Sequence, residues 1–210
     1  MDDIFYKSLL NKGLEKMGLV LTDAQTDLLL AFLNLLEKWN HAFNLTGVRD
    51  VRSMIGRHIL DSLSIQAYLQ GDRIIDVGTG AGLPGIPLSI LFPEKHFVLL
   101  DSNQKKQIFV AQAVKLLSLK NIECVQGRVE TYQPNQKFST IVSRAFAPLD
   151  RMLPLTEHLL LEDGRVLAML GKATPESHPL PPGYILNEFI TLEVPGEQAE
   201  RHLAIIGKKI

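Results

Sequence analysis

The stretch RIIDVGTGAGLPGIPL, residues 73–88, contains the residue types and spacing most suggestive of chemistry. Gly78, Gly80 and Gly82 alternate between two apolar runs, and a literal G-x-G-x-x-G runs from Gly80 to Gly85. Glycine tolerates positive φ and lets a ligand approach main-chain N–H groups closely. A tight turn needs only one or two glycines, so this set predicts a loop that binds a nucleotide-like ligand.

Two carboxylates discriminate between the possible ligands. Asp76 lies two residues before the first glycine, where a carboxylate would repel a phosphate but can accept hydrogen bonds from an ammonium group. Asp101 closes the next apolar run, HFVLLD, where it can accept both ribose hydroxyls. The segment GRVE, Gly127–Glu130, is predicted to border an adenine. This pattern favours S-adenosylmethionine, which has an ammonium group and no phosphate, over a dinucleotide.

The elements that must position these residues alternate between strand and helix from Arg73 onward. This order predicts a mostly parallel sheet with helices on both faces, in which ligands bind outside the carboxyl ends of the strands. Two further runs follow a proline-rich link without an intervening helix, and we expect them to pair as a C-terminal antiparallel hairpin. The predicted strands are RIIDV, HFVLLD, IECVQ, STIVSRA, RVLAML, YILNEFITLEV and RHLAIIG, and the predicted helices include SNQKKQIFVAQAVKLLS and LDRMLPLTEHLLL.

The first 70 residues have a helical pattern instead. Apolar residues spaced from Phe5 to Met17 make one face of a first helix, and Thr22 with Gln25 forms a capping-box signature ahead of a second. Asp50 can cap a third, VRSMIGRHILDSLSI. We therefore expect residues 1–70 to form a helical extension packed on a core domain of residues 71–210.

Composition limits the possible classes of protein. The chain has 210 residues, 46% of them hydrophobic, and it shows neither a signal peptide nor an apolar run long enough for a membrane span, so we expect a soluble cytoplasmic protein. Its single cysteine, Cys124, allows no internal disulfide or cysteine metal cluster, and we predict a buried strand thiol and no metal. The net charge is -1, so any contact with nucleic acid must be local.

Seven motifs in order resemble the RsmG family, also called GidB, over nearly the whole chain. They are KWNHAFNLTGVRD, RHILDSL, DVGTGAGLPGIPLSI, LLDS, GRVE, SRAF and ERHLAII. The resemblance implies a Rossmann-like methyltransferase that uses S-adenosylmethionine to methylate N7 of one guanine in 16S ribosomal RNA. It also implies donor contacts, which join those argued above in one predicted set: Asp76, Gly78, Gly80, Gly82, Leu83, Asp101, Val129, Glu130 and Arg144.

The reaction implied by this resemblance needs no general base, because guanine N7 carries a free lone pair in the neutral base. Arg144, at a strand end, is predicted to position the donor and the incoming base. Arg128 and Arg201 are predicted to hold RNA phosphates, since guanidinium groups match them bidentately. His58 and Asn44 are further candidates for substrate contact. Three other residues are expected to be structural: Asn40, Asp61 and the core residue Trp39.

The chain departs from the pattern of the family at two places, and two alternative functions remain open. Family members often carry a lysine where this chain has Leu170 before Gly171, and the link over residues 173–183 is rich in proline. The motif GAGLPG is also compatible with a nicotinamide-dependent oxidoreductase, and the same fold could serve as a catalytically silent RNA-binding or ribosome-assembly module. We expect a monomer whose partner is 16S rRNA in the small ribosomal subunit or an assembly precursor.

Overall fold

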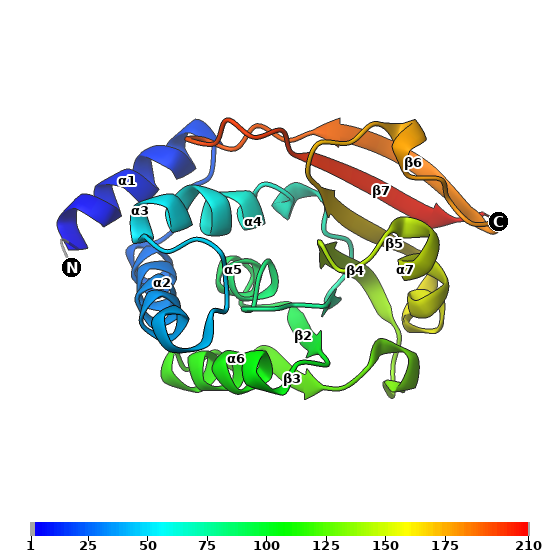
Figure 1. Cartoon of the computed structure of the whole chain (residues 1–210), viewed down its shortest axis with the longest axis horizontal. Coiled ribbons are helices and arrows are strands. Elements are labelled where there is room, and N and C mark those ends of the chain that lie inside the picture. Colours follow the sequence, from blue (N-terminus) through cyan, green and yellow to red (C-terminus); the bar gives the residue numbers. More distant parts are fainter. Residues whose placement is uncertain (1–2, 210) are drawn as a thin grey trace.

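Seven strands form one sheet in the order β3-β2-β1-β4-β5-β7-β6 in the computed structural model, which describes residues 3–209 (Figure 1). Strands β1 to β5 are parallel, β7 is antiparallel to β5, and β6 is antiparallel to β7. The predicted parallel sheet with a C-terminal hairpin is therefore confirmed. The strands are β1 Arg73–Val77, β2 His96–Asp101, β3 Ile122–Gln126, β4 Phe138–Arg144, β5 Leu160–Leu170, β6 Tyr184–Thr191 and β7 His202–Lys208.

Strand β1 is central because the strand order reverses there. It pairs with β2 on one side and with β4 on the other. Successive side chains point to opposite faces, so Ile74 joins one hydrophobic cluster while Ile75 and Val77 join the other. The glycine loop leaves the carboxyl end of β1 at this reversal, which is where open α/β sheets bind ligands.

Helices cover both faces of the sheet, as the alternating pattern predicts. One face carries α5 (Gly85–Leu91), α6 (Gln104–Leu116) and the N-terminal helices, and α7 (Leu149–Thr156) lies on the other (Figure 1). Phe109 on α6 packs in the same cluster as residues of the N-terminal helices. Among residues 3–209, no helix combines the length and the apolar character needed to cross a membrane.

The helical extension contains α1 (Asp3–Lys16), α2 (Asp23–Phe43) and a third, irregular helix. The predicted capping box at the start of α2 is present. The third helix begins at Val51 with Asp50 as its cap, but it is not regular: a π-helical turn, Ile55–Leu60, interrupts it before α4 (Asp61–Leu63). A π turn adds a residue to the turn and so alters which side chains face the sheet, which apolar periodicity does not reveal.

Three further features differ from the sequence predictions: the start of β5, the end of α7 and the burial of Cys124. Strand β5 begins at Leu160, five residues earlier than RVLAML, because Leu160 pairs with Phe138 before a register shift. Helix α7 ends at Thr156 and continues as a 3-10 turn, and the proline-rich link holds a single 3-10 turn, Pro175–Ser177. Cys124 is only partly buried on β3, and that burial raises its pKa to about 11, so the thiol is protonated.

Candidate active site

The glycine loop has the backbone that its sequence predicts. Gly78, Gly80 and Gly82 have φ values of 71°, 60° and 82°, a region that other residues rarely adopt. A Cβ at Gly78 would collide with the side chain of Phe146, whereas a Cβ at Gly80 would meet nothing closer than 3.9 Å. Gly78 is therefore required by conformation and packing together, and Gly80 leaves free space above the loop.

Asp76 lies beneath this loop and is fully buried. Its Oδ2 accepts hydrogen bonds from Thr79 Oγ1 at 2.7 Å and from the Gly85 N–H at 2.8 Å, so the carboxylate holds both ends of the loop. Its Oδ1 has no hydrogen-bond partner among residues 3–209. Burial raises the pKa of Asp76 to about 6, although these hydrogen bonds and the charge of Arg144 oppose the shift. The loop-holding role was not foreseen from sequence.

Asp101 connects the ends of β1 and β2. Its Oδ2 accepts a hydrogen bond from the Gly80 N–H at 2.9 Å, and its Oδ1 accepts one from the Asn103 N–H at 2.8 Å. Each carboxylate oxygen can accept a second hydrogen bond, and Asp101 lines the adjoining cavity. The residue predicted to bind a ribose is thus held in place by the loop itself.

A cavity of about 340 Å³, here called the donor cavity, opens at the carboxyl ends of β1 and β2. This volume lies in the range of small-molecule sites. The cavity brings together five of the predicted residues: Gly78, Asp101, Arg128, Val129 and Glu130. Sequence reasoning did not single out several other residues that line it, among them Ser102, Lys106 and Phe146.

Five predicted donor residues lie outside this lining, and one of them, Asp76, is buried beneath the loop. Leu83 is buried just before α5, and Gly80 and Gly82 shape the loop without bordering the donor cavity. Arg144 borders a second cavity of about 290 Å³, here called the target cavity, which lies between the extension and the ends of β4 and β5. Ala145 lines both cavities and has a positive φ of 54°, so the end of β4 forms the wall between them.

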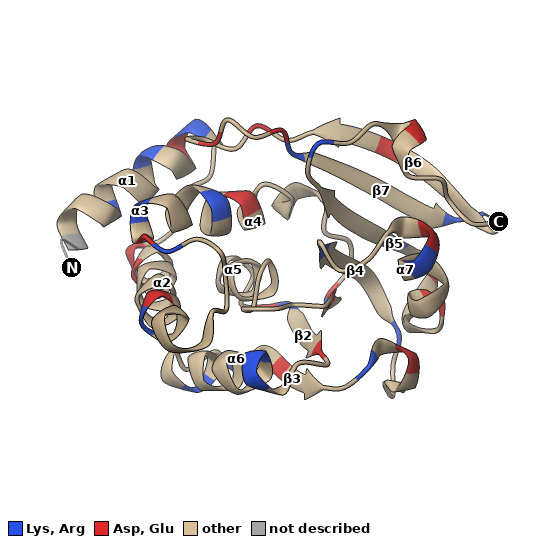
Figure 2. Ribbon diagram, in the orientation of Figure 1, with Lys and Arg blue, Asp and Glu red and all other residues tan. Residues whose placement is uncertain are grey.

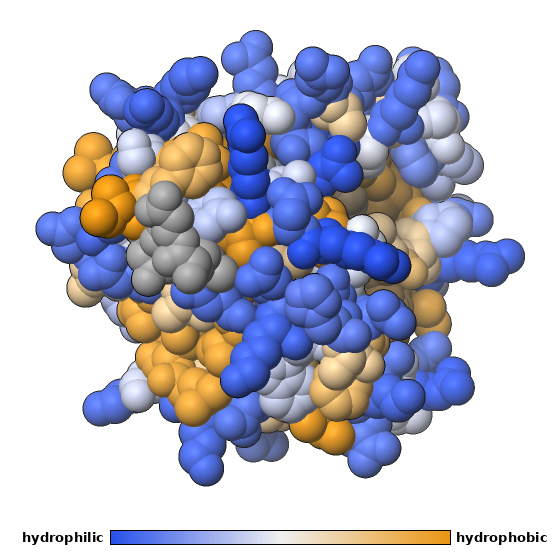
Figure 3. All heavy atoms as spheres, turned by 60° about the vertical axis from the view of Figure 1, so that its left-hand side comes forward, coloured by the Kyte–Doolittle hydropathy of each residue, from blue (hydrophilic) through white to orange (hydrophobic). Residues whose placement is uncertain are grey.

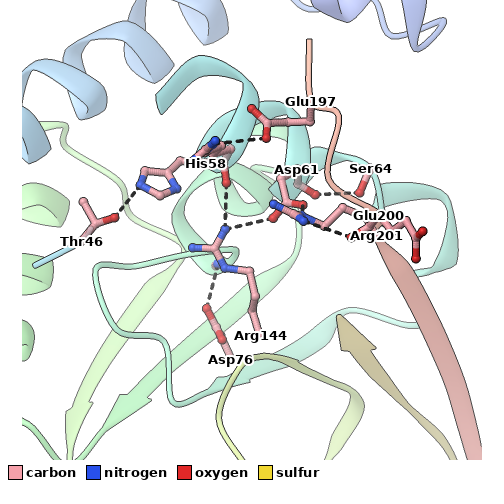
Figure 4. A network of polar contacts seen from close by, with 11 residues as sticks. Thr46, His58, Asp61, Ser64, Asp76, Arg144, Glu197, Glu200 and Arg201 are labelled. Carbon is pink, nitrogen blue, oxygen red and sulfur yellow. Dashed lines mark hydrogen bonds and ion pairs between the residues drawn. The ribbon is translucent and has the colours of Figure 1, made fainter. Parts of the chain in front are cut away.

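A buried carboxylate from the extension holds two arginines at the target cavity (Figure 4). Asp61 is 2% exposed; its Oδ2 lies 3.0 Å from Arg144 Nη1, and its Oδ1 lies 3.0 Å from Arg201 Nε. Arg144 Nη1 also donates to the carbonyl of Arg57 at 3.2 Å. A buried charge requires such pairing, so Asp61 fixes both guanidinium groups. Figure 4 shows the Arg144 guanidinium between Asp61 and Asp76.

The remaining candidates divide between buried and exposed positions. His58 lines the target cavity, and its Nε2 lies 2.8 Å from Thr46 Oγ1. Asn44 is exposed at the end of α2 and borders neither cavity. Asn40 is structural as predicted, because its amide bonds the backbone of Thr46 and Val48. Trp39 packs against Phe43 and Phe109, as expected of a core residue. Leu170 and Gly171, where a family lysine is absent, also line the target cavity.

The buried imidazole of His58 predicts a specific pH dependence of stability. Burial, reinforced by the charge of Arg144, lowers the pKa of His58 from 6.5 to about 4. Below pH 6.5 the unfolded chain therefore binds a proton that the folded chain refuses, and stability is lost as the pH falls from 6.5 to about 4. The loss should be on the order of 3 kcal/mol at the acid end.

Denaturant titrations across this pH range check that expectation against His58→Gln, which cannot take up the proton. The variant should show a shallower loss of unfolding free energy between pH 6.5 and 4. Parallel curves for the two proteins would mean that His58 titrates normally in the folded state.

The chain is similar in sequence to a family of known proteins. The family model described as "GidB: rRNA small subunit methyltransferase G" matches residues 25–204. The chain is 50% identical over 200 residues to "Ribosomal RNA small subunit methyltransferase G" of Marinobacter nauticus, covering 95% of this chain and 94% of that one. The protein of the same name from Legionella pneumophila strain Corby is 49% identical over 201 residues, with 95% and 94% covered.

A solved structure shares the fold at low sequence identity. It is a SAM-dependent methyltransferase from Geobacter sulfurreducens in complex with S-adenosyl-L-homocysteine, and it matches with a TM-score of 0.52 and 11% identity. The match covers 71% of this chain and 90% of that one. The predicted Rossmann-like methyltransferase fold is thereby confirmed.

Proposed function

Because the chain belongs to the rRNA small subunit methyltransferase G (GidB) family, we propose that it methylates N7 of one guanine in 16S ribosomal RNA, with S-adenosylmethionine as donor. The observation that carries this proposal is the pair of adjoining cavities that share Ala145. One has the acidic residues and glycine loop that suit the donor. The other has room and two fixed arginines for a base.

The residues around the donor cavity fit S-adenosylmethionine. Asp101 would accept hydrogen bonds from the ribose hydroxyls, and Val129 and Glu130 would border the adenine. Asp76 Oδ1, which is buried and has no hydrogen-bond partner in residues 3–209, would accept a hydrogen bond from the ammonium group, since Thr79 and Gly85 of the glycine loop already use Oδ2. When bound, the donor supplies an electrophilic methyl group on a sulfonium.

The chain's own contribution is positioning. Guanine N7 attacks with its lone pair, so no residue has to remove a proton first. Arg144 lies at the boundary between the cavities, where it orients the base, and Asp61 keeps its guanidinium in one place. Holding two reactants in line supplies several kcal/mol of barrier reduction. His58, kept neutral by burial, adds no charge to this wall.

We further propose the cellular setting. The chain works as a monomer in the cytoplasm on the small ribosomal subunit or an assembly precursor. Residues 71–210 carry the donor site, and residues 1–70 complete the target side through His58 and Asp61.

Label transfer tests the function directly. Small subunits that lack the modification are incubated with the protein and radiolabelled S-adenosylmethionine, and label is expected in the RNA. Calorimetric titration with the donor and with NADH distinguishes the alternatives. Tight NADH binding without donor binding would favour an oxidoreductase, and donor binding without label in RNA would favour an assembly module.

A further inference from the structure

A broad groove lies between the helical extension and the segment 195–199, next to the target cavity. It has a volume of about 900 Å³ and runs between α1, the start of the third helix and the segment 195–199. Gly13 on α1 and Gly56 in the π turn allow its walls to pack closely, because a Cβ at these positions would press on Leu60 and on Glu197 respectively. Figure 2 shows basic segments on α1 and on the neighbouring third helix.

The groove carries basic side chains that have no acidic partner. Lys12, Lys16 and Arg52 are exposed, and none of them makes an ion pair within residues 3–209. Arg57 does, because its Nε lies 3.2 Å from Glu197 Oε2. Four basic and two acidic side chains border the groove in total. In a chain of net charge -1, this excess marks a local site for an anion.

The groove is continuous with the proposed active site. Arg57 lines both the groove and the target cavity, and its carbonyl accepts the hydrogen bond from Arg144. Ala145 then connects the target cavity with the donor cavity. A polymer whose reacting unit entered the target cavity could therefore place its neighbouring units in the groove.

We propose that this groove binds the sugar–phosphate backbone of the rRNA strand next to the target guanine; the proposal rests on the function proposed above. Lys12 and Lys16 are one helical turn apart on the same face of α1, so they form a short row of cations. The view that brings the extension forward shows long hydrophilic side chains between apolar patches (Figure 3). Exposed cations without an acidic partner, arranged in a row, suit repeated phosphates, which release their bound counterions when they contact such cations.

The test replaces Lys12, Lys16 and Arg52 together with Gln, which preserves helix propensity at exposed positions. Arg57 stays unchanged because it also borders the target cavity. The matched control replaces Lys115, Lys120 and Lys209 with Gln, which removes the same charge from exposed positions outside the groove. Methyl transfer to small subunits that lack the modification is measured for both variants and the wild type between 50 and 200 mM salt.

The groove variant should have a KM raised about tenfold at low salt, with kcat and donor Kd unchanged. The loss of three phosphate contacts should make the plot of log affinity against log salt concentration less steep by about 2. Between 50 and 200 mM salt, the affinity of the variant should therefore fall roughly 20-fold less than that of the wild type. The control should behave as the wild type. A groove variant identical to the control, in a series where the wild type methylates subunits, would overturn the inference; failure of the wild type to methylate would overturn the proposed function instead.

A photo-crosslinking amino acid at position 16 identifies the partner. It is expected to capture 16S rRNA from the small subunit. Capture of a ribosomal protein without rRNA would overturn the assignment to RNA.

Discussion

Arg144→Ala is expected to fold and bind the donor, yet to slow methyl transfer by about 100-fold or more, because a misplaced base costs that much even when it is still bound. The variant also loses the hydrogen bonds to Asp61 and to the Arg57 carbonyl, so its unfolding free energy should drop by about 1–3 kcal/mol. Single-turnover rates on small subunits measure the first effect, and denaturant titration measures the second.

Arg201→Ala is the matched comparison, since it removes the other guanidinium from the same carboxylate. If Arg201 grips a phosphate, its loss should weaken RNA binding and reduce the salt dependence while donor affinity stays intact. The two variants should therefore fail in different ways. Normal turnover by Arg144→Ala, together with lost donor binding by Arg201→Ala, would mean that the roles given to the two arginines are reversed. The roles given to the two cavities would then also be wrong.

Asp101→Ala is expected to weaken donor binding by roughly 10- to 150-fold, which corresponds to about 1.5–3 kcal/mol for hydrogen bonds to a charged group. The carboxylate borders the donor cavity and also accepts the Gly80 N–H, so both the ribose contact and the loop would be affected. Calorimetric titration with S-adenosylmethionine measures the change.

Asp72→Ala provides the control for Asp101→Ala. Asp72 is exposed just before β1, at the opposite end of the strand from the glycine loop, and pairs with Lys95. Its removal should leave donor affinity unchanged. A folded Asp101→Ala protein with the dissociation constant of the wild type would remove Asp101 from the donor site.

The arrangement of the glycine loop and of the strand ends beside it could be predicted from sequence because its determinants are local. Asp76, the glycines and Asp101 all lie at or just beyond strand ends, and parallel strands bring such ends to one edge of the sheet. The positive φ values at Gly78, Gly80 and Gly82 follow from the residue type. The sequence could not show that one carboxylate oxygen of Asp76 accepts two hydrogen bonds from the loop, because those bonds depend on where the loop places Thr79 and Gly85.

The target side could not be predicted in the same way because its contacts join distant segments. Asp61 contacts Arg144 and Arg201, which follow it in the chain by 83 and 140 positions, and no local pattern encodes that packing. The π turn before Asp61 is also invisible to apolar periodicity, although it sets the positions of His58 and Asp61. The early start of β5 has a similar cause: LLEDG has turn residues, yet Leu160 pairs with Phe138 across a register shift.

Identification of the methylated nucleoside tests the central claim most directly. Small subunits that lack the modification are labelled with radioactive S-adenosylmethionine and the wild-type protein, and the 16S rRNA is digested to nucleosides and separated. The account predicts that the label appears as 7-methylguanosine, one per subunit. Label in another nucleoside, or none in the rRNA although the donor binds, would contradict it.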